Sequence, residues 1–297
     1  MNKITLLFGL FIVLNSCIKN NPDPSWLEIT AWDLIVNTAP NTNNAGVLTH
    51  DFSDAWVYVD NELVGVFELP VKIPLLISGD KVVKIFPAIK NNGISATKKI
   101  YPFVEIFEVT LNFIQNETIT INPVTKYVST VKFNIEDFED TSTIITEGPT
   151  SSSSLTVANT PSIFDPAINE TGFGRVLLDE LNNQWIASTL FNENGAALNM
   201  NLPQGREVYL EIDYYNTNSV VSGLIGVGNS GITTNPNVQL NFQDASNVKW
   251  KKIYIDLKEA VSGMANIDYY EFSFEALIKA GETNTEINID NIKAVYF

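Results

Sequence analysis

The residue types best suited to nucleophilic or metal chemistry are scarce in this chain. It has one cysteine, Cys17, and one histidine, His50, which Asp51 follows. A Ser-His-Asp triad needs a nucleophilic serine on a sharp turn, and the sequence offers no candidate for it. Zinc sites built from cysteine and histidine need more of these residues than the chain has. The sequence therefore favours a surface position for His50 and argues against these classes of enzyme.

Carboxylates are abundant, and they are the second kind of group that could do chemistry. The chain has 34 Asp and Glu against 18 Lys and Arg, which gives a formal net charge of −16. Clusters such as Asp137, Glu139 and Asp140, or Asp179 and Glu180, would suit a glycoside hydrolase that uses two carboxylates. In so acidic a chain, the same clusters also arise on a solvated surface without function. The charge repels nucleic acid, which is excluded as a partner.

The N-terminus is typical of an export and anchoring signal. A basic start precedes an apolar run over 4–14, which is too short to span a bilayer comfortably and suits the core of a signal peptide. The run ends in Leu14-Asn15-Ser16-Cys17, which resembles the relaxed lipobox of Bacteroidetes lipoproteins. That resemblance implies a signal peptide over 1–16 and a diacylated Cys17 that anchors the protein in the membrane. The alternative is a secreted protein in which Cys17 merely lies near the cleavage site.

Residues 17–26 are expected to form a tether. The segment is polar and contains two prolines, as in a spacer that holds a folded body off the membrane. Lys19 and Asp23 partly match the surface-export signal of some Bacteroidetes lipoproteins. The resemblance implies a protein anchored in the outer membrane and displayed at the cell surface, with the periplasmic face of that membrane as the alternative.

The remaining chain predicts two all-β domains. At roughly 100–200 residues per domain, a chain of 297 residues is long enough for two cores. Apolar and polar residues alternate with period two through most of it, which is the pattern of strands with one buried face. We place the domains at 27–125 and 126–297. The composition, with 45% hydrophobic and 18% charged residues, is that of a globular protein.

Residues 27–125 predict a small β-sandwich. Ala55–Asp60 and Leu63–Phe67 read as a hairpin that turns at Asn61-Glu62. Further strands are expected at 81–86, 103–111 and 118–121.

The same region resembles a PEGA-type or related surface module. The resemblance rests on the order of Trp56–Gly65, Leu69-Pro70 and Ile77–Ile85: a strand with a turn, a proline, and a returning strand led by glycine. It implies a non-catalytic module that faces the cell wall or serves as a scaffold.

Residues 126–297 predict a two-sheet jelly roll. Eight or nine strands in about 170 residues suit this architecture. The segment 257–264 is expected to be briefly helical, and the polar run over 141–160 is expected to be a long internal loop. Strands are expected at 127–135, 175–178, 185–189, 207–215, 222–227, 238–242, 249–257, 269–276 and 286–297.

The second domain resembles the galactose-binding-like jelly roll of many carbohydrate-binding modules. The residues that carry the resemblance are Phe138-Glu139-Asp140, Trp250–Leu257 and Ile287–Ile292. It implies a structural Ca²⁺ held by Glu139 and Asp290, since calcium takes six to eight oxygen ligands. The alternative is that Asp290 caps a turn or faces solvent. The resemblance also implies that Trp250 packs inside the sandwich.

A glycan-binding jelly roll would use aromatic faces against sugar rings and amides against hydroxyl groups. Adjacent tyrosines on a strand point to opposite faces, so one of each pair at most faces a ligand. From a wider set of tyrosines, tryptophans and asparagines, we take as candidates Trp185, Asn183, Tyr215 and Tyr270.

Three functions of different classes remain open. The first, which we favour, is a non-catalytic envelope protein that binds glycan through its jelly roll. The second is a structural or assembly component of an outer-membrane complex with envelope protein partners, which predicts an apolar patch without a groove. The third is a glycoside hydrolase that depends on two carboxylates in one cleft.

Overall fold

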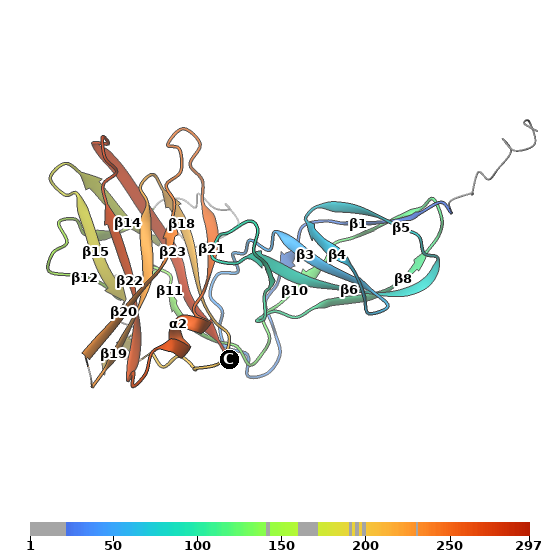
Figure 1. Ribbon diagram of the computed structural model, residues 1–297, viewed down its shortest axis with the longest axis horizontal. Coiled ribbons are helices and arrows are strands. Elements are labelled where there is room, and N and C mark those ends of the chain that lie inside the picture. Colours follow the sequence, from blue (N-terminus) through green and yellow to red (C-terminus); the bar gives the residue numbers. More distant parts are fainter. Residues whose placement is uncertain are drawn as a thin grey trace, which may run out of the picture.

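The structure is a computed structural model, which describes residues 22–140, 143–159, 172–189, 192–193, 196–197, 200–229 and 231–297. These residues form two β bodies side by side along the long axis of the molecule (Figure 1). We call them the first module, which holds β1 to β10, and the second module, which begins at β11. The prediction of an all-β chain, with a small sandwich followed by a jelly roll, is confirmed.

The first module has two main sheets and a short parallel pair. One sheet has the order β5-β1-β9, the other has the order β4-β3-β6-β7 with β8 on β6, and β10 pairs with β2. Their alternating apolar side chains fill a common core. The strands are β1 (Ser25–Ile29), β2 (Asp33–Leu34), β3 (Asp54–Val59), β4 (Glu62–Glu68), β5 (Val71–Leu75), β6 (Gly79–Lys90), β7 (Lys98–Ile100), β8 (Phe107–Phe113), β9 (Thr118–Ile121) and β10 (Val124–Thr125).

Two details of the first module differ from the sequence-based prediction. The β3–β4 hairpin turns at Asp60 and Asn61, one residue earlier than predicted, and both have positive φ angles of 50° and 68°. A two-residue turn in which both residues have positive φ angles matches the right-handed twist of the two strands that it joins. Asn and Asp adopt positive φ angles more readily than most residues. At the N-terminus, β1 already begins at Ser25, whose side chain is buried. The last two residues of the expected tether therefore belong to a sheet.

The second module is a sandwich of two antiparallel sheets. The order β13-β14-β23-β18-β21, with β11 also on β23, defines what we call the junction sheet, and β12-β15-β22-β19-β20 defines the open sheet. A small pair, β16 with β17, stands apart from both. The elements are β11 (Lys132–Glu136), β12 (Ile145–Glu147), β13 (Leu155–Asn159), β14 (Gly172–Asp179), β15 (Gln184–Thr189), β16 (Asn192–Glu193), β17 (Ala196–Ala197), β18 (Val208–Asn216), β19 (Val220–Gly228), β20 (Gly231–Leu240), β21 (Lys251–Asp256), α2 (Lys258–Gly263), β22 (Tyr269–Leu277) and β23 (Asn284–Tyr296).

The predicted strands of the second module and its short helix are confirmed in outline, with two exceptions. The segment 141–160, expected to be one long loop, contains β12 and β13. Both are edge strands, which pair with β15 and β14. Near the start of the module, the expected strand 127–135 is confined to β11, which begins at Lys132. Tyr127 instead forms an isolated bridge with Val104 and packs in the first module's core.

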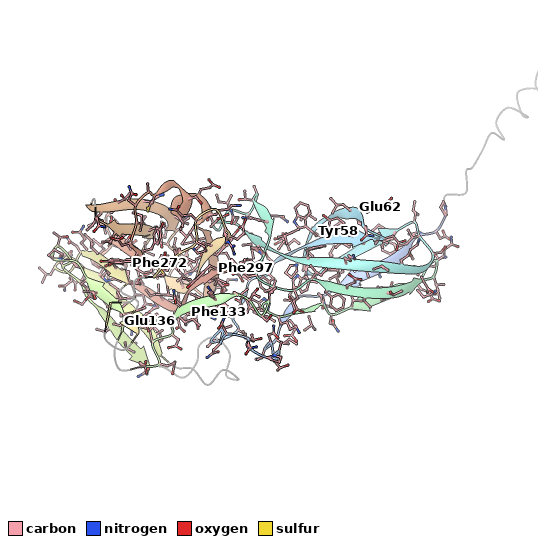
Figure 2. The ribbon with its side chains drawn as sticks, turned by 90° about the horizontal axis from the view of Figure 1, so that it is seen from below. Tyr58, Glu62, Phe133, Glu136, Phe272 and Phe297 are labelled. Carbon is pink, nitrogen blue, oxygen red and sulfur yellow. The ribbon has the colours of Figure 1, made fainter. Side chains whose placement is uncertain are left out.

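Aromatic side chains of both modules meet where the modules touch. Tyr209 and Tyr254 of the junction sheet lie in one core with Tyr101 and Phe103 of the first module. The ring centroid of Tyr101 lies 5.0 Å from that of Tyr254 and 5.5 Å from that of Tyr209. The C-terminal Phe297 adds a ring 5.0 Å from Phe103, at the boundary between the two bodies (Figure 2). The two modules therefore share part of their hydrophobic core.

A buried charged network lies beside these rings. Glu211 is fully buried, and its carboxylate accepts hydrogen bonds from the hydroxyls of Tyr101 and Tyr127, the latter at 2.9 Å. The Nζ atom of Lys252 lies 3.0 Å from Glu211 and 3.3 Å from Asp213. Burial by itself raises the pKa of Glu211, but the nearby lysine charges outweigh it and lower the pKa below its usual value. The carboxylate is thus held ionised by partners from both modules.

Candidate functional site

The outer face of the open sheet differs sharply from its inner face. Along β15 and β22, buried Trp185, Phe272 and Phe274 point into the sandwich core. The residues between them point outward; Ser188 and Ser273 are short and polar, and Ile186 is aliphatic. This alternation follows from the period of two along a strand. The outer face therefore carries short polar side chains next to aliphatic ones, and we call this surface the floor.

Strand pairing brings the short polar side chains of this floor into a row. Thr146 pairs with Ser188 across β12 and β15, Ser188 pairs with Ser273 of β22, and Ser273 pairs with Gly223 of β19. Neighbouring strands lie roughly 4.8 Å apart, so the row crosses four strands at that spacing. Gly223 has no side chain and leaves the row open at its end. Three hydroxyl groups therefore lie side by side across the sheet.

A second row runs parallel to the first and is mainly apolar. Ile186 of β15 pairs with Glu275 of β22, which pairs with Val221 of β19. Ile225 and Thr234 pair across β19 and β20. They extend the floor to β20, the last strand of the open sheet. The face thus combines aliphatic surface with hydroxyl and carboxylate oxygens.

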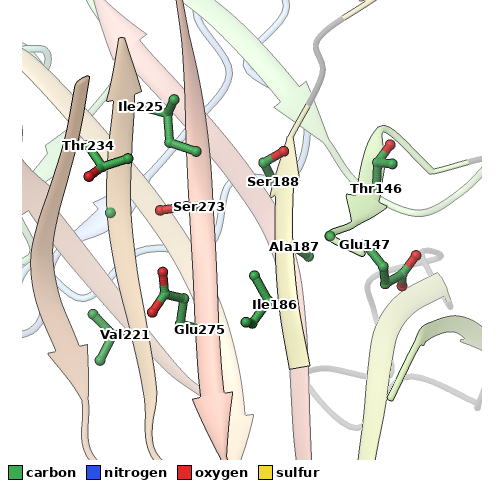
Figure 3. A pocket seen from close by; sticks show the side chains of 12 residues that line it. Thr146, Glu147, Ile186, Ala187, Ser188, Val221, Ile225, Thr234, Ser273 and Glu275 are labelled. Atoms are coloured by element: carbon green, nitrogen blue, oxygen red, sulfur yellow. The ribbon is translucent and has the colours of Figure 1, made fainter. Parts of the chain in front are cut away.

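These rows line a groove of about 350 Å³, which we call the sheet groove (Figure 3). Its size lies at the lower end of the range usual for small-molecule sites. The side chains in Figure 3 come from all five strands of the open sheet. The residues that line it are Thr146, Glu147, Gly148, Ile186, Ala187, Ser188, Val221, Gly223, Ile225, Thr234, Ser273 and Glu275.

The carboxylates in and beside the sheet groove have different environments. Glu147 accepts a hydrogen bond of 2.7 Å from the backbone N–H of Leu155, which fixes one of its oxygens. Glu275 is exposed and free to contact a ligand. Glu271, one outward position before Ser273, is half-buried, and this burial raises its pKa although the hydroxyl of Ser188 donates a hydrogen bond to it. The groove can therefore accept hydrogen bonds from a ligand rich in hydroxyl groups.

Trp185, one of the predicted glycan contacts, lies in the core of the second module. Its side chain is fully buried, and its ring stacks on Phe274 with the ring centroids 5.7 Å apart and an interplanar angle of 14°. The prediction that Trp185 contacts glycan is therefore wrong. The polar residues 182–184 before Trp185 are typical of a loop and suggested that Trp185 is exposed. In the structure, Trp185 instead occupies an inward position of β15.

Tyr270 is also a core residue. It is 3% exposed, and its hydroxyl donates a hydrogen bond of 3.3 Å to the backbone oxygen of Val261 in α2. The prediction that Tyr270 contacts glycan is also wrong, because Tyr270 occupies an inward position of β22. Its neighbour Tyr269 faces outward and is half-buried.

Asn183 and Tyr215 lie at separate places, and neither lines the sheet groove. Asn183 is exposed in the loop before β15, where its side-chain oxygen accepts a hydrogen bond of 3.4 Å from Ser152. Tyr215 lies on the outer face of the junction sheet, half-buried beside Trp250. Their contact with glycan stays a prediction, but the structure does not join them with the other candidates into one site.

Trp250 was expected inside the sandwich, and this expectation is wrong. The residue lies just before β21, half-buried, with its ring centroid 5.8 Å from those of Phe173 and Tyr215. These residues form an aromatic cluster outside the second module's core. The pattern of alternation was correct, but it did not say which of the two faces is the core face.

Glu139 and Asp290, the residues expected to bind calcium, both interact with the backbone. The exposed Glu139 accepts a hydrogen bond of 2.7 Å from the N–H of Gly172, and the buried Asp290 accepts one of 2.7 Å from the N–H of Asn291. Within the described parts of the chain, no group of three or more His, Cys, Asp or Glu is placed to hold a metal ion. Calcium binding stays a prediction.

Cys17, the predicted lipidation site, and the predicted signal peptide over 1–16 lie outside the described residues. Among the helices that the structure describes, none is long and apolar enough to cross a membrane. The membrane anchor and the outer-membrane location therefore stay predictions.

The sequence analysis missed the floor of the sheet groove, although it contained a signal. Ser188, Ser273 and Gly223 are small residues at outward positions of β15, β22 and β19. A search for aromatic platforms passes over such positions. What aligns them is the register of β15, β22 and β19, which no single strand reveals.

Comparisons with known proteins give matches among solved structures only. No family model matches the chain, and no curated protein matches it. The family 30 carbohydrate-binding module of a cellulosomal cellulase of Clostridium thermocellum matches 55% of this chain and 96% of its own, with 13% identity and a TM-score of 0.38. A family 11 carbohydrate-binding module of Clostridium thermocellum, in complex with a mixed-linked β-1,3-1,4 tetrasaccharide, matches 55% of this chain and 94% of its own, with 9% identity and a TM-score of 0.34.

Part of an enzyme is also similar. An exo-β-agarase matches 54% of this chain with 25% of its own length, at 11% identity and a TM-score of 0.36. The carbohydrates and the reaction named for these structures are properties of those proteins.

Proposed function

We propose that this protein is a non-catalytic envelope protein that binds a glycan chain in the sheet groove. The observation that carries the proposal is the row of Thr146, Ser188 and Ser273 across the open sheet, beside the apolar row that includes Ile186 and Val221. Sugars present hydroxyl groups at their edges and C–H groups on their ring faces. The two rows offer complementary groups for both.

The shape of the groove favours an extended ligand. Its floor crosses the strands of one sheet, and its lining comes from all five of them. Glu147 on β12 and Thr234 on β20 line the groove at its opposite ends, so polar groups are available at both ends. A polysaccharide segment that crosses the strands would contact the whole floor.

The test is binding of the full-length protein, purified in detergent, to a panel of soluble and insoluble polysaccharides. Affinity electrophoresis and pull-down should show retention by at least one glycan. Ser273→Trp places an indole on the groove floor and should abolish that retention. Thr120→Trp, at an exposed position of β9 in the first module, is the matched control and should leave it unchanged. Absence of retention across the panel would instead favour a structural or assembly role with envelope protein partners.

The proposal includes a structural calcium ion bound by Glu139 and Asp290. Calcium requires further oxygen ligands, which backbone carbonyls would supply. If the ion supports the second module, a chelator should lower both the thermal stability of the protein and its glycan retention. Glu139→Gln should then remove the response to the chelator. A response that persists in this variant would contradict the assignment.

The proposal also includes anchoring of the protein in the outer membrane through a diacylated Cys17. It is the chain's only cysteine, and it follows Leu14-Asn15-Ser16 after an apolar run. Mass spectrometry of the N-terminal peptide should show a lipid-modified cysteine. Cys17→Ser should move the protein from the membrane fraction to the soluble fraction. Surface display predicts that external protease cleaves the protein in intact cells.

One observation favours hydrolysis as a second candidate function. Glu147 of β12 and Glu275 of β22 both line the sheet groove, and a glycoside hydrolase uses two carboxyl groups in one cleft. Release of reducing ends from the retained glycan distinguishes the two functions. Binding without release supports the non-catalytic function, whereas release that Glu147→Gln or Glu275→Gln abolishes, with the glycan still retained, would establish the enzyme.

A further inference from the structure

The described chain enters the first module at the end opposite the second module. In Figure 1, β1 starts at that end, and the two modules meet at the other. Strand β6 connects the two ends. It begins at Gly79, close to the start of β1, and Asn91, the residue after it, bridges to Tyr254 of the second module. At roughly 3.3 Å per residue, its 12 residues cover about 40 Å. We call the end where the chain enters the entry tip.

Two loops flank the residues at which the chain enters. The loop between β5 and β6 is held by Ser25, whose hydroxyl donates a hydrogen bond of 3.0 Å to the backbone oxygen of Ile77. The loop between β8 and β9 is held by Pro24, whose backbone oxygen accepts a hydrogen bond of 2.9 Å from the N–H of Asn116. Both loops are therefore fixed next to the entry point of the chain.

Each of these loops carries an exposed aliphatic side chain. Leu76 is 69% exposed, and Ile114 is 50% exposed. A single exposed aliphatic residue is common on protein surfaces. Here two of them stand on loops that flank the same residues, at the place where the chain leads to the proposed lipid anchor. This placement indicates a lipid surface as their partner.

The chain between the proposed anchor and the entry tip is short. Cys17 and Pro22, the first described residue, are five positions apart. A fully extended chain advances at most about 3.6 Å per residue, so the entry tip lies within about 18 Å of Cys17. A flexible chain of this length has a root-mean-square end-to-end distance of roughly 12 Å. The headgroup layer on each side of a bilayer is itself about 5–8 Å thick. An anchor at Cys17 therefore keeps the entry tip at or near the headgroups.

The charge at the entry tip indicates which lipid surface fits. Asp23, Asp80 and Glu117 are exposed there. The nearby Lys81 is paired with Asp60 at 2.8 Å and adds no net positive charge. Anionic headgroups repel carboxylates that lie within about one Debye length of them. The entry tip therefore suits a bilayer surface of zwitterionic lipid, where the aliphatic side chains supply the attraction.

We propose that the entry tip docks on a zwitterionic surface of the membrane that holds the anchor, with Leu76 and Ile114 in contact with the lipid. This inference rests on the proposed lipidation of Cys17. Because the two modules share part of their core, the second module then stands at the far end of the molecule from the lipid. Docking thus keeps the sheet groove away from the membrane and open to glycan.

The test uses the lipid-modified full-length protein in vesicles of phosphatidylcholine. Cys17 is the chain's only cysteine, and lipidation consumes its thiol, so an introduced cysteine is the only thiol that a fluorophore can label. Gln115→Cys, at an exposed position of the loop between β8 and β9, reports on the entry tip. Glu180→Cys, at an exposed position between β14 and β15, reports on the second module. Lipid with a spin label in its headgroup should quench the fluorophore at position 115 at least twofold more strongly than the one at position 180.

Two double variants locate the contact. Leu76→Ser/Ile114→Ser should weaken the quenching of the label at position 115 at least twofold. Leu181→Ser/Leu277→Ser is the matched control, because it removes two aliphatic side chains of the second module that are 89% and 63% exposed. It should leave the quenching unchanged. Equal losses in both double variants, no loss in the first one, or equal quenching at both label positions would overturn the docking.

The vesicles separate the remaining outcomes. Phosphatidylglycerol in the vesicles should weaken the quenching at position 115, because its charge repels the carboxylates of the entry tip. Stronger quenching would overturn the assignment to a zwitterionic surface. Protein that sediments with the vesicles but shows no quenching at position 115 would overturn the docking and leave the anchoring intact. Protein that does not sediment with them would overturn the anchoring, and the docking with it.

Discussion

The two sheets of the second module share a core but use their outer faces in opposite ways. The outer face of the junction sheet packs against the first module with Tyr209, Tyr254 and the buried pair of Glu211 and Lys252. The outer face of the open sheet carries small polar residues and a groove. Because both sheets alternate with period two, the difference lies only in the outward residues. Large rings and paired charges form a junction, and short side chains form a floor.

This difference indicates where substitutions can act. The outward residues of the junction sheet that the first module covers, such as Tyr209 and Glu211, are buried, so their removal affects folding and the arrangement of the modules. An outward residue of the open sheet has few neighbours, so its removal affects what binds there. The predictions below test this contrast, beginning with the largest expected change.

Lys252→Met should destabilise the protein by about 3–5 kcal/mol, because it leaves Glu211 and Asp213 buried without their cation. Urea unfolding followed by tryptophan fluorescence measures the loss. As a control, Glu211→Gln/Asp213→Asn/Lys252→Met removes all three charges and should cost less than the single substitution. If Lys252→Met is as stable as the native protein, water solvates the carboxylates at the junction. The contrast between the outer faces of the two sheets would then be false.

Trp185→Phe should destabilise the protein by about 1–3 kcal/mol, through lost packing against Phe274 and the surrounding core. Glycan retention by the folded variant should be unchanged, because Trp185 is fully buried beneath the sheet groove. Thermal unfolding and affinity electrophoresis on one sample separate the two effects. Lost retention at full stability would restore Trp185 as a ligand contact.

Acid should affect the two faces with opposite signs. The pKa of Glu211 at the junction is lowered in the folded state, so its contribution to stability is complete above the unfolded value of about 4.5 and is lost as the pH falls further. The pKa of Glu271 on the open sheet is raised by burial, so its ionisation opposes folding, and this opposition vanishes as the pH falls.

Glu271→Gln should therefore raise the free energy of unfolding at pH 7 and have no such effect at pH 4. Glu211→Gln should lower the free energy of unfolding at pH 7, with a smaller effect well below pH 4.5. Urea titrations of both variants and the native protein at pH 7, at pH 4 and well below pH 4.5 measure these changes in the free energy of unfolding. The same sign for both variants at pH 7 would contradict the assigned environments.

Sequence reasoning predicted the fold class because period-two alternation is strong in strands of both modules, such as β1, β8, β15 and β22. The alternation assigned Trp250 and Ser273 each to one of two faces, but it could not say which face the first module covers. That depends on contacts such as Tyr101 with Tyr209, whose residues lie more than a hundred positions apart. The sheet groove could not be predicted from the sequence for a related reason. Its hydroxyl row depends on the register between β15 and β22, which aligns Ser188 with Ser273.

The smallest change in stability is expected on the open sheet, together with a clear change in binding. Glu275→Gln should alter the free energy of unfolding by less than about 0.5 kcal/mol, because the side chain is exposed. It should weaken glycan binding about tenfold, because a charged acceptor contributes roughly 1.5 kcal/mol or more to a ligand hydrogen bond. Glu282→Gln, in an exposed ion pair with Lys279 outside the groove, is the matched control. If Glu275→Gln binds glycan as the control does, the carboxylates of the open sheet are surface charge, and the groove has to act through its hydroxyl row.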